Sequence, residues 1–319
     1  MRAAGIRQIG GRVSLLDLPE PRALAANEVR LNVITAGVGN WDELVRTGDW
    51  DVGVSPSMAL GVEAAGVVTE VGGDVKEFGV GDEVLTHDVP LLGNGFWAEQ
   101  AIANASHVAL KPTELGWPEA AACPVPALVA IEVLAEVLRL HCGDSLVVNG
   151  GGGTTGGLVV QLAVAMGLTV VATASNSEEK RLRCLGAHGV VDYRDPQWPI
   201  EARRIVGAPG FAGAVNTARG GAAATLRAIA DGGQLATITG DPPPTERGVV
   251  VKDVYVRPDG RHLGDIAKLF CSGRLSVPIG ATFALNEAAE ALALSASGQA
   301  DGAVVLLIPD KEPIRRIDK

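Results

Sequence analysis

A glycine-rich turn between two apolar runs lies near the middle of this 319-residue chain. A strand-like run, Ser145–Asn149, leads into eight residues that read Gly-Gly-Gly-Gly-Thr-Thr-Gly-Gly, and a helix-like apolar run from Leu158 follows. In a doubly wound α/β sheet, this order brings free N–H groups and the positive end of a helix dipole to one point, where a pyrophosphate binds. The sequence therefore predicts a dinucleotide site. The residues expected at the phosphates are Gly150, Gly153, Thr154 and Thr155.

Other interpretations of the same run are weaker. Residues 145–177 carry no charge over 33 positions, but the glycines divide them into segments too short to cross a membrane. No Lys follows the glycines, which excludes the phosphate loop of nucleoside triphosphatases. A purely structural turn remains the alternative.

The end of the next predicted strand bears on the choice of dinucleotide. A carboxylate there would hold the ribose 2′-hydroxyl of NAD, but the sequence reads Ala172-Thr173-Ala174-Ser175-Asn176-Ser177. Lys180 and Arg181 follow within a helical turn and could pair with a 2′-phosphate, which favours NADPH over NADH. The alternative is that Ser175 and Ser177 only cap a helix, since Ser175 and Glu178 have capping-box spacing. This helix is expected over 178–185, with Gly186 as its left-handed end.

The chain divides into two kinds of sequence. Its first third has short glycine- and proline-punctuated strands, whereas strands and helices alternate from about Glu119. We expect an α/β protein with a β-rich domain (1–118 and 277–319) and a doubly wound parallel-sheet domain (119–276). The expected parallel strands are 145–149, 169–173, 188–192, 212–217, 234–239 and 249–256. A strand after Pro278, a helix from near Asn286 and a last strand over 303–308 are expected to close back on the first domain.

Charge and cysteines limit the partners and the compartment. The net charge is -10, which disfavours nucleic acid and anionic membranes. The four cysteines form no Cys-x-x-Cys pair, and residues 1–7 do not resemble a secretory leader. We expect reduced thiols and a cytoplasmic location.

Several motifs together resemble the medium-chain dehydrogenase/reductase superfamily, specifically its zinc-free, quinone oxidoreductase-like branch. The resemblance covers nearly the whole chain. The motifs are Ala36-Gly37-Val38 with Asp42, Gly61-Val62-Glu63-Ala64-Ala65-Gly66, Gly79-Val80-Gly81-Asp82-Glu83-Val84, the glycine turn with Gln161-Leu162-Ala163, Leu185-Gly186-Ala187 with Asp192-Tyr193, and Asp231-Gly232-Gly233-Gln234-Leu235.

The resemblance implies a GroES-like catalytic domain and a Rossmann domain without a metal. Zinc-dependent members hold the metal with a Cys and a His, where this chain has Gly39 and Val62. Cys123 alone cannot build a tetrahedral site. Without a Lewis acid, the feasible reaction is hydride delivery from NADPH to an acceptor activated by conjugation, a quinone or an α,β-unsaturated carbonyl.

The resemblance also places the cofactor and the substrate. It puts the nicotinamide in a cleft between the domains, near Asn40, and puts Tyr193 at the adenosine end. The remaining cofactor contacts are Thr217, Thr239, Tyr255 and Val256. The expected walls for a planar apolar substrate are Trp41, Trp50, Asn94, Phe96 and Trp97, with ordinary core packing as the alternative for the aromatic residues.

The proton donor is not assigned by the sequence. Leu44 replaces a Tyr found in relatives, and Asn40 lies one place after the usual Asn. Asn40 and His87, the latter expected in a loop, are the candidates. Two alternatives to a quinone or enone reductase stay open: an enoyl reductase of a biosynthetic pathway, and a dinucleotide-binding protein without turnover. The resemblance also implies a homodimer.

Overall fold

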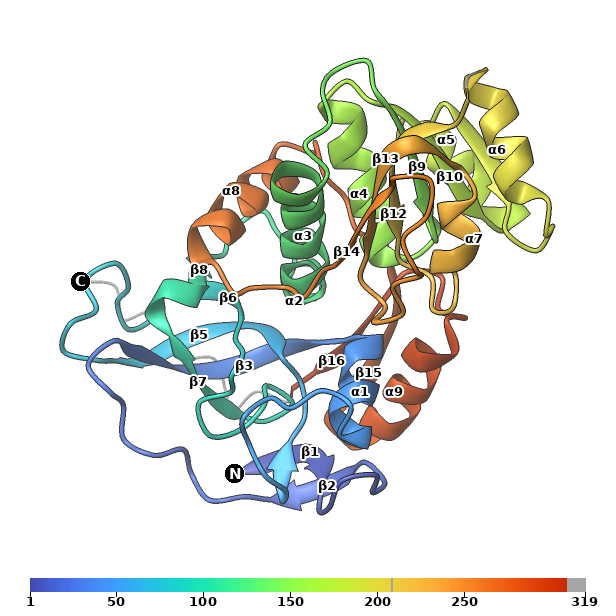
Figure 1. Cartoon of the computed structure of the whole chain (residues 1–319). Helices are drawn as coiled ribbons and strands as arrows, with labels where there is room; N and C mark the ends of the chain where they lie inside the picture. The colour runs from blue at the N-terminus through green and yellow to red at the C-terminus, as the bar shows by residue number, and fades with distance from the viewer. Residues whose placement is uncertain (208, 309–319) are drawn as a thin grey trace. The chain divides into compact units, whose positions relative to one another are not determined.

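The computed structural model describes residues 1–207 and 209–308 (Figure 1). Contacts divide the chain into two compact units. Unit 1 combines Met1–Val125 with the chain from Arg257 onward, and unit 2 is Pro126–Val256.

Unit 2 is built on a six-stranded parallel sheet. Its strands are β9 (Ser145–Asn149), β10 (Thr169–Ala174), β11 (Gly189–Asp192), β12 (Phe211–Asn216), β13 (Ile229–Thr237) and β14 (Val250–Asp253). They lie in the order β11-β10-β9-β12-β13-β14, and every neighbouring pair is parallel. The order reverses at β9, and such a switch point is where doubly wound sheets bind ligands.

Helices follow the strands of unit 2. They are α3 (Pro124–Ile131), which begins at the unit boundary and continues as the π-helix η2 (Glu132–Val137), α4 (Thr154–Ala165), the 3-10 turn η3 (Asn176–Glu178), α5 (Glu179–Cys184), α6 (Trp198–Val206) and α7 (Ala222–Leu226). α4 packs on β9 and β10, α6 on β10 and β11, and α7 on β12 and β13. Buried apolar side chains such as Val147, Phe211 and Leu235 form the core beneath them.

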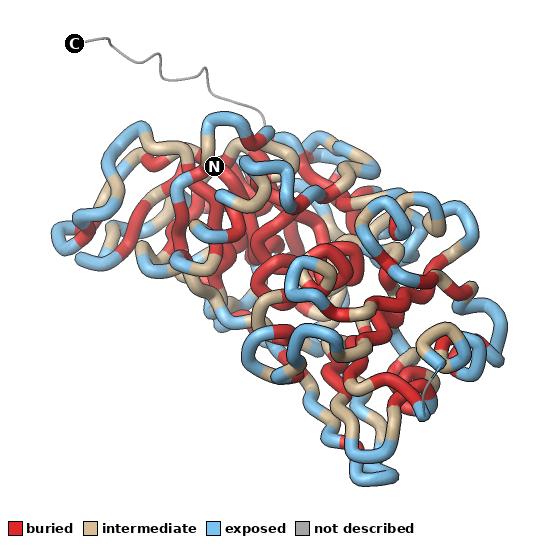
Figure 2. Tube along the Cα trace, turned by 90° about the horizontal axis from the view of Figure 1, so that it is seen from above, coloured by how far each residue is buried: buried red, intermediate tan, exposed pale blue. Residues whose placement is uncertain are grey.

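Unit 1 contains two sheets. A seven-stranded sheet has the order β15-β16-β3-β5-β6-β8, with β7 also paired to β3. Its strands are β3 (Glu28–Val38), β5 (Glu63–Val71), β6 (Glu83–His87), β7 (Gln100–Asn104), β8 (Val108–Leu110), β15 (Ile279–Ala284) and β16 (Ala303–Leu307). A smaller sheet has the order β2-β1-β4, from β2 (Ser14–Asp17), β1 (Arg2–Ile6) and β4 (Met58–Ala59). Strands such as β3, β5 and β6 are largely buried. Figure 2 shows buried and exposed stretches alternating along the chain, with many exposed stretches in outward loops.

The helices of unit 1 are α1 (Asn40–Thr47), α2 (Trp117–Ala122), α8 (Gly260–Cys271) and α9 (Ala288–Ser297), with 3-10 turns η1 (Ala105–His107) and η4 (Leu285–Glu287). α2 packs on β3 and β5, and α9 packs on β15 and β16. The last strand, β16, pairs antiparallel with β3. The chain therefore returns to its first domain, as predicted.

The α/β fold class is confirmed, with a parallel Rossmann-like sheet and a β-rich second unit. Two local expectations differ from the structure. α8 lies in the segment assigned by sequence to the nucleotide-binding domain, but it packs on β8 and η1 of unit 1. The expected helix over 178–185 is a 3-10 turn followed by α5, and Gly186 takes the predicted positive φ of 97°.

Candidate functional site

The glycine turn links β9 to α4 within unit 2. Gly153 is the N-cap residue of α4, so the N–H groups of Thr154, Thr155 and Gly156 lie in its first turn and lack acceptors within the helix. A Cβ at Gly156 would overlap the carbonyl oxygen of Gly150, so only glycine lets α4 approach the turn this closely. The free N–H groups and the helix dipole together form an anion site suited to a pyrophosphate.

Hydrogen bonds with Thr173 and Thr217 hold this turn. Gly151 N donates to the Thr173 carbonyl at 2.9 Å, and Gly150 N donates to Thr173 Oγ1 at 3.0 Å. Thr217 Oγ1 donates toward the carbonyls of Asn149 and Gly150, at 3.0 and 3.2 Å. The turn is therefore ordered by the protein itself, which lowers the entropic cost of binding phosphates.

Arg181 has a role that the sequence did not indicate. Its Nη2 donates to the carbonyl of Gly152 at 2.7 Å, and its Nε donates to Glu178 Oε2 at 2.5 Å. Arg181 is thus committed to the turn and to a carboxylate, rather than offered to a 2′-phosphate.

The capping-box prediction at the start of this helix is wrong. Ser175 is the N-cap residue of η3, but its side chain makes no capping hydrogen bond within the described structure. Its Oγ lies 2.8 Å from Ser177 Oγ, and the Glu178 carboxylate pairs with Arg181 instead. Because neither hydroxyl caps the backbone, both remain available at the end of β10.

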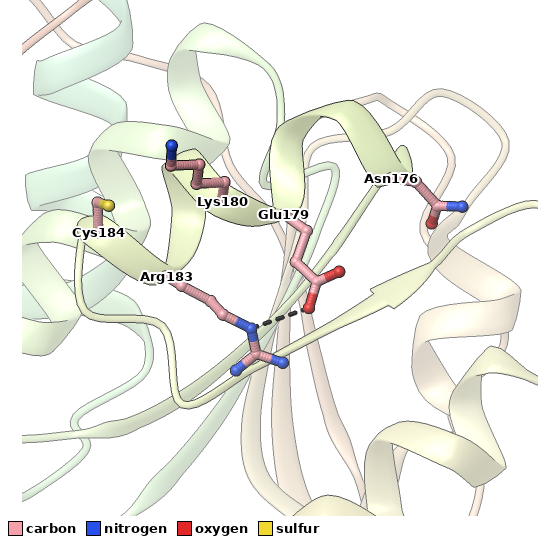
Figure 3. A pocket seen from close by; sticks show the side chains of 5 residues that line it. All are labelled: Asn176, Glu179, Lys180, Arg183 and Cys184. Atoms are coloured by element: carbon pink, nitrogen blue, oxygen red, sulfur yellow. Dashed lines mark hydrogen bonds and ion pairs between the residues drawn. The ribbon is translucent and has the colours of Figure 1, made fainter.

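Lys180 lies on a different face of α5 from Arg181. It is exposed and lines a shallow pocket with Asn176, Glu179, Arg183 and Cys184 (Figure 3). Within that group, Glu179 and Arg183 are paired to each other at 2.9 Å.

The other predicted cofactor residues all follow strands of the same parallel sheet. Thr217 follows β12, Thr239 follows β13, and Tyr255 and Val256 follow β14. Tyr193 follows β11, is half exposed and lies against the Arg194 guanidinium. Because parallel strands end at one edge, the sheet brings these residues to the same side as the glycine turn. Tyr255 is bonded to Asp253, which raises the pKa of the phenol.

In unit 1, the predicted aromatic walls differ in exposure. Phe96 and Trp97 are fully buried, and Trp97 Nε1 donates to the Gly37 carbonyl at 2.9 Å. Trp41 and Trp50 are half-buried on and just after α1. Asn94 accepts from Ala59 N at 3.1 Å and lines a pocket of about 220 Å³ with segments 19–22 and 100–102. Trp41, Trp50 and Asn94 therefore retain surface for a ligand, whereas Phe96 and Trp97 pack in the core.

The two candidate proton donors also lie in unit 1. Asn40 is half-buried at the start of α1. His87 is not in a loop, because it is the last residue of β6 and is fully buried. Its Nδ1 donates to the Val62 carbonyl at 2.8 Å, and burial lowers the pKa of the ring to about 4. A neutral, buried ring of this kind favours a structural role at pH 7.

The residues at the family's metal position do not fit a zinc ion. A Cβ at Gly39 would overlap the Trp41 indole, so Trp41 fills the space that a ligand side chain at position 39 needs. Val62 offers no metal-binding atom. The Cys123 thiol is buried, and burial raises its pKa, which opposes the thiolate that zinc requires. Among the described residues, no group of three or more His, Cys, Asp and Glu side chains could hold a metal ion.

Two buried carboxyl groups beside this position were missed by the sequence analysis. Asp42 Oδ2 accepts from Gly39 N at 2.8 Å, and burial raises the pKa of Asp42 to about 8. Glu63 Oε2 accepts from Val125 N at 2.7 Å, and burial raises its pKa well above the usual range. The sequence interpretation used both positions only as family motif residues. A signal was present at Glu63, because residues 58–68 are otherwise all apolar or glycine.

Two family models match the chain. Residues 25–113 match the alcohol dehydrogenase GroES-like domain, and residues 185–306 match the zinc-binding dehydrogenase model. No helix within residues 1–207 and 209–308 has the length and apolar character needed to cross a membrane.

The chain spans only part of the length of the curated relatives that it matches. The chain is 32% identical over 322 residues to the spectinabilin polyketide synthase system protein NorB of Streptomyces orinoci, which covers 94% of this chain but only 14% of that protein. It is 30% identical over 310 residues to 2-methylene-furan-3-one reductase of Solanum lycopersicum, covering 93% of this chain and 76% of that one. It is 29% identical over 218 residues to quinone oxidoreductase of Pongo abelii, covering 66% and 64%.

Solved structures share the whole fold. An NAD-dependent alcohol dehydrogenase superposes with a TM-score of 0.88 at 27% identity, covering 97% of this chain and 100% of that chain. A mycobacterial protein complexed with NADPH superposes with a TM-score of 0.86 at 26% identity, covering 96% and 100%.

Proposed function

Because the chain belongs to the medium-chain dehydrogenase/reductase superfamily, in its zinc-free, quinone oxidoreductase-like branch, we propose that it is an NADPH-dependent reductase of quinones or α,β-unsaturated carbonyls. The observation that carries the proposal is the braced glycine turn at the switch point of the unit 2 sheet. It supports dinucleotide binding, and the family's oxidoreductases support the reaction type.

In this proposal the chain's own residues bind and orient the cofactor. The first-turn N–H groups of α4 would hold the phosphates, Thr217 would fix the turn beneath them, and Thr239, Tyr255 and Val256 would border the nicotinamide. A reduced nicotinamide, when bound, supplies the hydride for the acceptor. Tyr193 would border the adenosine end.

The preference for NADPH rests on the end of β10. Ser175 and Ser177 offer hydroxyls and no carboxylate at the ribose position, and exposed Lys180 offers a cation. The paired Glu178 beside Gly152 opposes this preference. Structural neighbours of both cofactor types occur, so the hydroxyl pair is the feature to test.

We predict that Ser175→Asp reverses the cofactor preference. Its carboxylate would repel a 2′-phosphate and accept from a 2′-hydroxyl, so the KM for NADPH should rise at least tenfold while that for NADH falls. Steady-state kinetics with both cofactors measures this. Ser14→Asp, at an exposed serine of unit 1, is the matched control and should change neither value.

Zinc independence rests on sterics and ligand chemistry. Trp41 fills the space above Gly39, and Val62 and buried Cys123 complete no donor set. A conjugated acceptor needs no Lewis acid to accept a hydride, so this reaction class suits such a site.

The deciding experiment measures oxidation of NADPH and NADH by metal-free protein with quinones, enals, enones and enoyl thioesters. We expect quinone or enone turnover that survives a chelator. Saturable NADPH binding without turnover of any acceptor would overturn the reductase assignment and favour a binding protein.

An enoyl reductase is the second candidate. The match to NorB, a polyketide synthase system protein, covers 94% of this chain and supports a thioester substrate. Faster turnover of enoyl thioesters than of free enones in the same panel would select this function.

We also propose a cytoplasmic homodimer with no nucleic-acid or membrane partner. All four cysteines are free, which suits a reducing compartment. β14 is an outer strand of the unit 2 sheet and supplies an edge for pairing.

A further inference from the structure

A line of buried polar side chains crosses the carboxyl ends of four parallel strands in unit 2. Thr173 on β10, Asn149 on β9, Asn216 on β12 and Thr237 on β13 are each at most 3% exposed. The line starts at Gly150 in the glycine turn and ends at Asp241, beyond Thr239.

Successive members are joined by hydrogen bonds. Gly150 N donates to Thr173 Oγ1 at 3.0 Å, and Thr173 Oγ1 donates to Asn149 Oδ1 at 2.6 Å. Asn149 Nδ2 donates to Asn216 Oδ1 at 2.9 Å. Asn216 Nδ2 donates to Thr237 Oγ1 at 3.1 Å and to Thr239 Oγ1 at 2.9 Å. Thr239 Oγ1 donates to Asp241 Oδ1.

Each of these hydrogen bonds runs in the same direction, from a donor on the Gly150 side to an acceptor on the Asp241 side. This direction suits both ends, because the Gly150 N–H can only donate and the Asp241 carboxylate can only accept. The two asparagine amides continue it by accepting at Oδ1 and donating at Nδ2. Asn216 is the central member: its Oδ1 accepts from Asn149, and its Nδ2 donates to Thr237 and Thr239. The Thr225 hydroxyl beside it donates to the Gly221 carbonyl at 2.9 Å. A buried, fully bonded network strengthens cooperatively and admits few alternative geometries.

We propose that this hydrogen-bond chain fixes the turn at 239–241 relative to the glycine turn, and that Asn216 and Asp241 are positioning residues for the dinucleotide. This proposal rests on the proposed function, in which the glycine turn holds the phosphates and Thr239 borders the nicotinamide. Neither Asn216 nor Asp241 needs to touch the cofactor.

The test variant is Asn216→Asp, which keeps size and shape but removes the Nδ2 donor. Asn149 can still donate to residue 216, so the glycine turn should stay ordered. Thr237 and Thr239 must instead donate to the new carboxylate, which leaves Asp241 without its donor. The double variant Asn216→Asp/Asp241→Asn restores a complete chain, because an amide at 241 can donate to Thr239 while Thr239 donates to residue 216.

The readout compares two ligands by calorimetry: NADPH, and 2′-phospho-ADP-ribose, which lacks only the nicotinamide. For Asn216→Asp we expect the Kd of NADPH to rise at least tenfold and that of the fragment less than threefold, with the double variant recovering most of the NADPH affinity. Thr225→Val is the control. It removes a hydroxyl that lies beside Asn216 but is not a member of the hydrogen-bond chain, so the Kd of each ligand should change less than twofold.

Different failures identify different errors. If wild-type protein binds neither ligand, the proposed function fails. If Asn216→Asp binds NADPH as wild type does, or loses both ligands equally without recovery in the double variant, the positioning role is overturned. Should Asn216→Asp not fold, Thr173→Val serves instead: it cuts the chain at the phosphates, so both Kd values should rise together, and unchanged values overturn the proposal.

Discussion

At the residue scale, Gly39 and Trp41 determine what occupies the position in unit 1 at which zinc-dependent family members hold the metal. The Gly39 backbone is extended, with φ of -117°, so an alanine there meets no conformational strain. The obstacle to an alanine at this position is steric, because its Cβ would overlap the Trp41 indole. The absence of a side chain at Gly39 therefore leaves the space that the Trp41 ring occupies.

We predict that Gly39→Ala destabilises the protein by about 2 kcal/mol, the usual cost of overpacking a filled site. In a Trp41→Ala background the same change should cost little, because the ring is gone. Urea unfolding of the four proteins of this double-mutant cycle measures the coupling. Equal costs in both backgrounds would contradict the steric argument.

Asp42 gives a second prediction at this scale, a pH dependence of stability. Burial raises its pKa to about 8 in the folded protein, against about 3.9 in an unfolded chain. Between these values the folded state keeps a proton that the unfolded state has released, so stability falls by about 1.4 kcal/mol per pH unit. Asp42→Asn carries no titrating proton, so wild type should lose stability relative to it by that amount per unit between pH 5 and pH 7.

Urea midpoints at several pH values measure this difference. Both proteins should carry Glu63→Gln, because the charge of Asp42 contributes to the raised pKa of Glu63 and the two titrations are coupled. His87 is present in both proteins, so its own titration cancels. Parallel stability profiles would contradict a neutral, buried Asp42.

Residue positions were predictable where backbone geometry imposes a residue type. The glycine turn was located because only glycine permits α4 to approach Gly150 so closely. His87, Phe96 and Trp97 were expected near the substrate, but all three are fully buried. Their burial depends on pairing between β5 and β6 and on contacts of segment 95–99 with β1 and β4, which local sequence does not report.

At the element scale, α5 acts as a brace for the turn before α4. Arg181 projects from α5 to the Gly152 carbonyl and is held there by Glu178 on η3. Ser175 and Glu178 have capping-box spacing, but the structure uses Glu178 for this ion pair instead. The ion pair that fixes the neighbouring turn therefore forms in place of the local capping box.

We predict that Arg181→Met weakens NADPH binding roughly fivefold, about 1 kcal/mol, because the turn loses one hydrogen bond that preorganises it. Calorimetric titration measures the Kd. Arg183→Met, on the same helix, removes the exposed pair with Glu179 and a bond to the His188 carbonyl, neither of which involves the glycine turn, so the Kd should stay unchanged. A similar loss in both variants would indicate a general charge effect rather than bracing.

Element boundaries show which signals are local. β9 matches its predicted bounds because glycine and polar residues interrupt its apolar run at both ends. β13 starts at Ile229, five residues before the prediction, because Ile229 pairs with Phe211 ahead of a register shift. Regular pairing resumes at Gln234, the predicted start. α1 in the β-rich third was not predicted at all, although Gly39 and Gly48 bound it.

At the scale of the whole molecule, the alternation of strands and helices was sufficient to predict the doubly wound sheet. Right-handed crossovers leave few orders for six parallel strands, and the observed order is one of the common ones. The division into units was harder to predict, because α8 has ordinary amphipathic helix character. Only its packing on β8 and η1 assigns it to unit 1.

The same sheet leads to the last prediction, on assembly. Within the described chain, β14 pairs with β13 alone, so its other edge has free N–H and C=O groups, and Val250 on it is half exposed. Such edges are either protected or paired with another chain. We therefore expect two copies to join β14 to β14 by an isologous contact.

Val250→Asp should convert this dimer to a monomer, because it places two like charges at the symmetric contact. Light scattering after size-exclusion chromatography measures the mass. Val80→Asp is the matched control, since Val80 is more exposed than Val250 but belongs to unit 1 and lies in no strand. A dimer that persists in Val250→Asp would place the interface elsewhere, whereas a monomeric wild type would remove the need for β14 pairing altogether.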